Sequence, residues 1–266
     1  MLNRPLCIRS LADHAKNIVS WMIGVVSLVV VQLLVYPTIR DSSEEWSGVT
    51  QDFPEVLKEM LRMTDYTSET GYLNTELMSF TVPFIFVMMG ATWGARVATE
   101  DEENGTADIV LSLPVSRPEY MVSRLVAAMA VVLITATAFA TTLTVGARVL
   151  DLSIPVSRYA AAGISLAVLG LVTLSIAALV GSFTGRRGVS LGLATAVAIA
   201  AFVAYSLAPL VDFFGHIESA SPFRWTIGTL PLMSGFDMGY LSLGLGVSVL
   251  LTLASVWRFG RRDIKV

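Results

Sequence analysis

The sequence predicts an all-α integral membrane protein that crosses the bilayer with six helices. Of its 266 residues, 54% are hydrophobic and only 15% are charged, whereas a soluble domain carries about 25% charged residues. The charges cluster between long apolar stretches, and about 20 apolar residues suffice to cross the hydrocarbon core as a helix. Lipid offers the backbone no hydrogen bonds, so such stretches should be helical. A soluble helical bundle would need a large polar surface, which this composition does not supply.

Six apolar stretches have the length of a membrane span, and none carries a charged residue near its middle. Together they form a single transmembrane domain over residues 1–266. The spans are expected at residues 18–36, 77–97, 120–146, 159–181, 189–211 and 240–257.

A short interfacial helix is expected before the first span. In residues 4–17, apolar side chains from Ile8 to Ala15 share one helical face, and charged side chains from Arg9 to Lys16 share the other. Such a helix lies on the surface of a leaflet. The alternative is a solvated tail.

The distribution of positive charge orients the spans. With six spans both termini lie on the same side, and 12 of the 18 Lys and Arg residues fall on that side. Positive charge concentrates in cytoplasmic loops. We therefore expect a multi-pass protein of the plasma membrane with both termini in the cytoplasm.

Two longer segments are expected outside. Residues 39–76 are acidic, and within them residues 52–61 have the apolar periodicity of an amphipathic helix. We expect that helix to pack on the outer ends of the spans. Residues 212–239 are apolar but interrupted by Pro222, Pro231 and several glycines. They are too broken to span, and they predict short re-entrant-like helices that dip into the outer leaflet.

The fifth span carries small residues at every fourth position. Such a row lets two helix backbones approach closely. It could contact a second copy of the chain or a helix of the same chain. The row consists of Gly188, Gly192, Ala196, Ala200, Ala204 and Ala208.

The tetrapeptide PVSR occurs twice, at 114–117 and at 155–158. Both copies precede a predicted span, where Pro ends the previous element and Ser can cap the helix. Ser116 and Glu119 have the spacing of a capping box, which the second copy lacks. We interpret the repeat as a coincidence of helix-entry chemistry, so a specific function must depend on what precedes the first copy.

The cytoplasmic segment 99–117 begins with four consecutive acidic residues, Glu100–Glu103, followed by Asn104 and Gly105. Carboxylates just before a helix interact favourably with its dipole, and residues 106–113 can form a short helix. That helix would be about 12 Å long, too short to be stable alone. Held between two spans, it is suited to docking into a groove of a partner. The alternative is an ordinary loop.

This segment resembles the cytoplasmic signature of type-2 ABC transporter permeases, in which E-x-G-T leads into L-x-x-P-V-S-R before the third span. The six-span layout, the N-terminal helix and the interrupted outer segment are also similar to that family. Two departures are the acidic lead-in 100–103 and Asp108, where the family often has a larger residue. The matching residues are Glu103, Gly105, Thr106, Leu111, Pro114, Val115, Ser116 and Arg117.

The resemblance implies a permease subunit that exports its substrate, with two permease chains (a homodimer or heterodimer) and separate ABC ATPase subunits. The chain has no G-x-x-x-x-G-K-[ST] loop, so ATP and Mg²⁺ are expected on the ATPase. We expect this chain to be no enzyme and to bind no cofactor, metal or nucleic acid. The family's dimer contacts involve the first and fifth spans, which places Gly192, Ala196, Ala200 and Ala204 at the contact. The implied coupling residues are Glu102, Glu103, Gly105, Thr106, Ile109, Leu113, Pro114 and Arg117.

Two other functions fit the sequence less well. An ATP-independent secondary transporter or channel usually has ionisable or broken-helix sites near the midplane, and these spans offer only Gln32 and scattered hydroxyls. An intramembrane enzyme is disfavoured because His14 and His216 lie on opposite sides. The G-x-S-x-G pattern at 188–192 has no strand before it. An uncharged pathway suits an amphipathic or lipid-like cargo.

Overall fold

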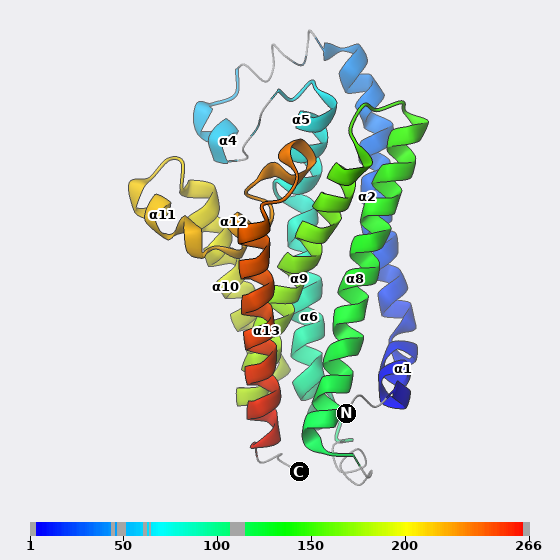
Figure 1. The fold of residues 1–266 in the computed structure, drawn as a ribbon, viewed down its shortest axis with the longest axis vertical. Coiled ribbons are helices and arrows are strands. Elements are labelled where there is room, and N and C mark those ends of the chain that lie inside the picture. Colours follow the sequence, from blue (N-terminus) through cyan, green and yellow to red (C-terminus); the bar gives the residue numbers. More distant parts are fainter. Residues whose placement is uncertain are drawn as a thin grey trace.

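Six long helices lie side by side in the computed structural model, which describes residues 4–43, 46, 52–60, 63, 65–106 and 115–262 (Figure 1). Each is long and apolar enough to cross a membrane, which confirms the predicted all-α membrane architecture. Both chain ends lie at one end of the bundle, here called the termini end. The six helices are α2 (Ala15–Asp41), α6 (Thr81–Glu103), α8 (Arg117–Val149), α9 (Val156–Thr184), α10 (Arg187–Leu207) and α13 (Met238–Gly260).

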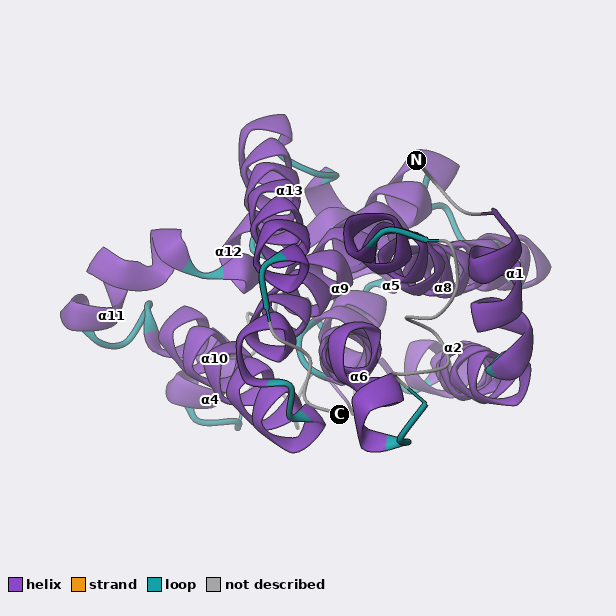
Figure 2. Ribbon diagram, turned by 90° about the horizontal axis from the view of Figure 1, so that it is seen from below, coloured by secondary structure: helices purple, strands orange, loops and turns teal. Residues whose placement is uncertain are grey.

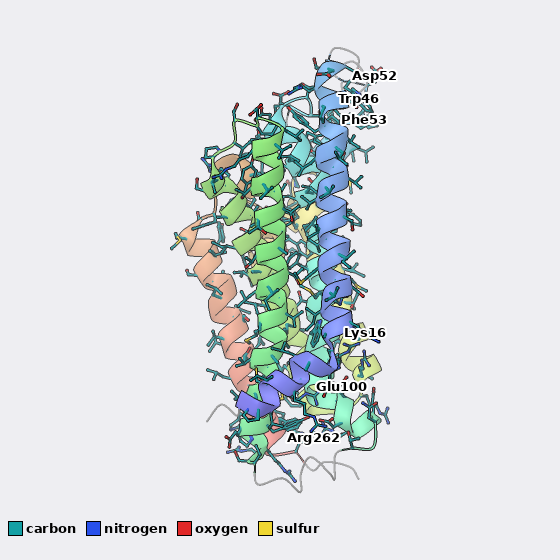
Figure 3. All side chains as sticks on the ribbon, turned by 90° about the vertical axis from the view of Figure 1, so that its right-hand side faces the viewer. Lys16, Trp46, Asp52, Phe53, Glu100 and Arg262 are labelled. Carbon is teal, nitrogen blue, oxygen red and sulfur yellow. The ribbon has the colours of Figure 1, made fainter. Side chains whose placement is uncertain are left out.

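The N-terminal helix α1 (Arg4–Asp13) is separate from α2, as expected, and turns away from it at the termini end. In Figure 3 it crosses the base of the bundle at an angle to α2, and it packs against α8. The turn at His14 therefore brings α1 beside the ends of α6 and α8.

The other end of the bundle, called the opposite end, is covered by short helices. They follow the interrupted pattern expected for residues 212–239. The helix α4 (Glu55–Met60) contacts the span α10, as expected. Its apolar side is only partly covered, because Phe53, Val56 and Leu57 are between 38% and 52% exposed. These elements are α4 (Glu55–Met60), α5 (Glu69–Leu73), the π-helical turn η1 (Asn74–Met78), α11 (Asp212–Ile217), the 3-10 turn η2 (Glu218–Ala220), α12 (Pro222–Thr226) and the π-helical turn η3 (Leu230–Ser234).

The core forms around α9, which contacts α6, α8, α10 and α13 (Figure 2). Glycines let α6 and α9 touch backbone to backbone. A Cβ added to Gly90 would lie 2.3 Å from the carbonyl oxygen of Gly170, and one added to Gly94 would lie 2.2 Å from that of Leu174. Because apolar side chains gain little by leaving lipid for a helix contact, such close packing is a main attraction between membrane helices.

The small-residue row of the fifth span does not make this kind of contact within the chain. Gly188 and Gly192 have no heavy atom within 4 Å of an added Cβ, and Ala196 and Ala200 are exposed. Instead α10 packs on α6 and α9 through a row displaced by two residues, Ser190, Ala194 and Ala198. Ala204 is buried within the chain, so of the four residues expected at a dimer contact, three are exposed.

The two PVSR copies begin their helices differently. Ser116 is the N-cap of α8, and its hydroxyl accepts a hydrogen bond from the backbone N–H of Glu119 at 3.4 Å. In the second copy Pro155 is the N-cap of α9, and no side chain caps that helix. Both copies stand where a helix begins, as expected, but the expected serine cap forms only in the first copy.

Candidate functional site

The acidic residues Glu100, Asp101, Glu102 and Glu103, here called the acidic quartet, form the last turn of α6. They were expected in a linker that precedes a short helix, and the span was expected to end at residue 97. Four carboxylates at a helix C-terminus oppose the helix dipole. Since successive residues of a helix point about 100° apart, each carboxylate can meet a different neighbour. These contacts offset the unfavourable interaction with the helix dipole.

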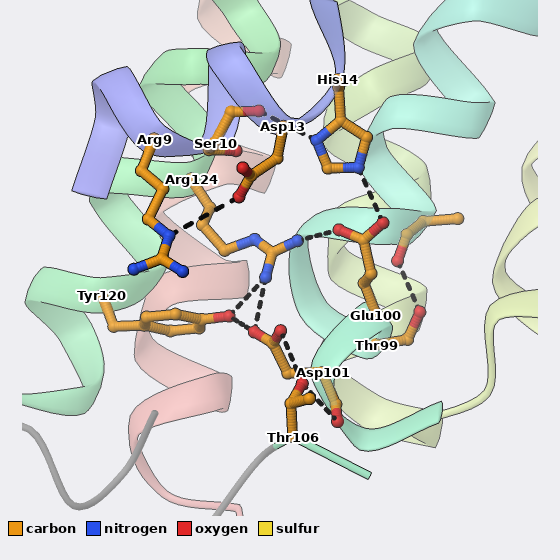
Figure 4. Close-up of polar contacts among 11 residues, drawn as sticks. Arg9, Ser10, Asp13, His14, Thr99, Glu100, Asp101, Thr106, Tyr120 and Arg124 are labelled. Atoms are coloured by element: carbon orange, nitrogen blue, oxygen red, sulfur yellow. Dashed lines mark hydrogen bonds and ion pairs between the residues drawn. The ribbon is translucent and has the colours of Figure 1, made fainter. Parts of the chain in front are cut away.

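Glu100 joins α6 to α1 and to α8 (Figure 4). Its carboxylate accepts a hydrogen bond from Nε2 of His14 at 2.9 Å and forms an ion pair with the guanidinium of Arg124. Nδ1 of His14 lies 2.9 Å from the backbone oxygen of Ser10. Both ring nitrogens thus face oxygen acceptors, and only an imidazolium, with a proton on each nitrogen, can donate to both.

Asp101 makes a second connection to α8. Nη1 of Arg124 donates to its carboxylate at 2.5 Å, and the hydroxyl of Tyr120 also bonds to it. The Arg124 guanidinium lies 5.6 Å from the centre of the Tyr120 ring. One arginine of α8 thus bridges two consecutive carboxylates of α6.

Glu102 connects α6 to the end of the chain. Its carboxylate pairs with the guanidinium of Arg262, which also donates to the carbonyl oxygen of Gly181 on α9 at 3.0 Å. Nη1 of Arg117 donates to the backbone oxygen of Arg262 at 2.7 Å. The guanidinium passes so close to Gly185 that a Cβ there would lie 2.0 Å from Nη2.

Glu103 caps a neighbouring helix. Its Oε1 accepts a hydrogen bond from the backbone N–H of Arg187 at 2.8 Å, and Arg187 is the first residue of α10. A carboxylate at a helix N-terminus satisfies an otherwise unpaired N–H and interacts favourably with the dipole.

The residues Gly105 and Thr106 that match the family signature form the cap that ends α6. Gly105 has a φ of +66°, a conformation that glycine adopts without strain. The backbone N–H of Thr106 donates to the carbonyl oxygen of Asp101 at 2.9 Å, and that of Gly105 to the oxygen of Glu102 at 3.3 Å. This is a Schellman motif, and the Thr106 hydroxyl strengthens it with a bond to the Asp101 carboxylate at 3.2 Å.

The structure brings together five of the eight coupling residues expected from the sequence: Glu102, Glu103, Gly105, Thr106 and Arg117. The other three, Ile109, Leu113 and Pro114, lie outside the described residues, as does most of the short helix expected over 106–113.

Sequence reasoning missed the partners of the quartet. His14 and Arg262 lie 86 and 160 residues from their carboxylates, and the sequence shows them only as members of a positively charged side. The one available signal was electrostatic, because four consecutive acids in a positively charged region need cations close by.

The arrangement ties the end of α6 to α1, α8, α9 and α10 and to the residues that follow α13. It has no feature of a catalytic centre, and in the part of the chain that the structure describes no three His, Cys, Asp or Glu residues are placed to hold a metal ion. Its physical role is to hold the helix ends together where segment 107–114 leaves α6 and enters α8.

Comparison with known proteins agrees with this architecture. A comparison with functionally curated sequences gives no significant match. A family model described as ABC-2 family transporter protein matches residues 10–264, which is nearly the whole chain and includes all six membrane helices. The match identifies a multi-pass membrane subunit of an ABC transporter. The chain therefore belongs to the ABC-2 family of transporter membrane proteins.

Proposed function

We propose that this chain is the permease subunit of an ABC exporter of the plasma membrane, driven by a separate ATPase. In this arrangement both termini and the acidic quartet lie in the cytoplasm. The concentration of Lys and Arg at the termini end supports that orientation, and the absence of a nucleotide-binding loop from the sequence supports a separate ATPase that holds ATP and Mg²⁺.

The contacts of the acidic quartet are the main support for the proposed mechanism. Segment 107–114 connects α6 to α8, and the two helix ends are also joined by the pairs of Arg124 with Glu100 and Asp101. A push by the ATPase on this segment would therefore move both helix ends together. Through Glu103, Glu102 and His14 the same displacement would reach α10, the end of α13 and α1. The spans would then move as a connected set, as alternating access requires.

Two permease chains are proposed to meet along the exposed row of α10. Gly192, Ala196 and Ala200 are exposed, and among the described residues none lies within 4 Å of a Cβ added to Gly192. The cargo is proposed to be an amphipathic molecule, because the spans have few charged groups near their middle.

Docking can be tested by replacing Ile109 and Leu113 with Asp and measuring co-purification with the ATPase. A charged group in an apolar contact without a partner is strongly unfavourable, so we expect co-purification to be lost while the chain still inserts into the membrane. Val56→Asp is the matched control, since Val56 is an exposed apolar residue of the short helix α4 at the opposite end. Normal co-purification of the double variant would rule out this docking segment.

A further inference from the structure

Two apolar grooves flank the half of α8 that lies toward the opposite end. One, of about 390 Å³, lies between α8 and α2, and the other, of about 470 Å³, lies between α8 and α9. Figures 1 and 3 show α2 and α8 side by side along this half. Thr141 and Val145 line both grooves and form the ridge between them.

Small residues form the floors of the grooves. A Cβ added to Gly146 of α8 would lie 2.3 Å from a methyl carbon of Leu33 on α2, and one added to Gly163 of α9 would lie 2.9 Å from the Cβ of Ala140. The helices therefore touch below, while longer side chains such as Leu34 and Val145, 70% and 63% exposed, form the walls above.

The hydroxyl groups in the grooves do not make them polar. Thr141, Thr142 and Thr144 each donate to a backbone oxygen of their own helix, at 2.8, 2.8 and 2.7 Å. A threonine bonded in this way leaves its hydroxyl hydrogen unavailable to a ligand. The two grooves thus offer apolar walls and no free donor from these threonines.

Arg148 places a positive charge at the end of the ridge. Arg148 follows Thr141 and Val145 at helical spacing on the exposed side of α8, in the last turn of the helix. Among the residues that the structure describes, none forms an ion pair or a hydrogen bond with its guanidinium. At the end of a membrane helix such a side chain lies at the depth of the lipid headgroups.

We propose that this surface binds one glycerophospholipid of the leaflet at the opposite end. One acyl chain lies in each groove, and the phosphate binds Arg148 above the ridge that separates them. Two apolar grooves that share one ridge and end at one cation match a ligand with two chains and one anionic group. A single helix from a second copy of the chain would fill one groove and leave the other open. The exposed Asp151 follows three residues later, so a headgroup that also carries an amine is compatible with the site.

The test is native mass spectrometry of the full chain purified in detergent, stripped of lipid and titrated with palmitoyl-oleoyl phosphatidylglycerol. We expect one tightly bound lipid per chain. Arg148→Gln should weaken this binding by about tenfold, the effect of losing a charge-assisted contact. Diacylglycerol has the same two chains and no phosphate, so it should bind about tenfold more weakly to the unmodified chain and be indifferent to Arg148→Gln.

A second set of variants fills the grooves with large side chains. Thr141→Trp on the ridge should abolish the tight site, and Ala160→Trp should weaken it by blocking only the groove between α8 and α9. Arg40→Gln and Leu250→Trp are the matched controls, exposed positions that line neither groove. Equal lipid binding by Arg148→Gln, Thr141→Trp and the unmodified chain would overturn the proposal. So would a Thr141→Trp chain that changes from dimer to monomer while keeping its lipid, because the grooves would then hold a second copy.

Discussion

Replacing Arg124 by Met should strongly destabilise the chain, because this arginine pairs with two carboxylates at once. Its side chain is 12% exposed and that of Glu100 is 15% exposed, so both charges are largely withdrawn from water. Removing one partner of a buried pair leaves an uncompensated charge and costs about 3–5 kcal/mol. For a chain of this size, each kcal/mol lowers the thermal midpoint by roughly 2–4 °C. The expected decrease is therefore about 10 °C.

The assay is thermal unfolding of the purified chain in detergent, with Lys16→Met as the matched control, because Lys16 is an exposed cation outside the quartet. An exposed substitution of this kind should change stability by less than about 0.5 kcal/mol. Neutralising the two carboxylates in the Arg124→Met background, by Glu100→Gln with Asp101→Asn, should recover much of the loss, since neither carboxylate charge is then left without its arginine. If Arg124→Met unfolds at the same temperature as Lys16→Met, the quartet does not hold the helix ends together.

Two further predictions concern helix packing. Gly90→Ala should destabilise the chain by about 1–3 kcal/mol, the usual cost of overpacking, because its Cβ would meet the backbone oxygen of Gly170 at 2.3 Å. The control Gly24→Ala, at a position with open space around it, should not lower the thermal midpoint. Equal thermal midpoints for the two variants would refute the close α6–α9 contact. In a Cys7→Ser background, chains with the single substitution Ala196→Cys or Ala200→Cys should cross-link to a second copy in membranes. The control Ala194→Cys should not cross-link, because Ala194 is buried. Absence of cross-linking at both exposed positions would argue against the proposed dimer contact.

The end of α6 is set partly by the local sequence and partly by tertiary contacts. The apolar run predicts a span, because charged residues are costly in lipid, and so the expected end was residue 97. The helix continues to Glu103 because Arg124 and Arg262 pair with three of its last four carboxylates and a backbone N–H of α10 bonds to the fourth. The Schellman cap at Gly105 was encoded locally, since glycine adopts a positive φ without strain.

The sequence alone determined the number and approximate positions of the six spans, the separate N-terminal helix and the cap at Ser116. These depend on interactions within a few residues, or on the requirement that backbone groups in lipid bond within their own helix. Only the tertiary structure decided which small residues make close contacts. Gly90 meets Gly170 across two helices, while a Cβ added to Gly192 meets no atom of the described residues within 4 Å, although both glycines lie in glycine- and alanine-rich spans. The tertiary structure also decided the partners of the acidic quartet. A pairing such as Glu102 with Arg262 depends on how six helices meet at one end of the bundle. The periodicity of the local sequence carries no information about two residues so far apart in the chain.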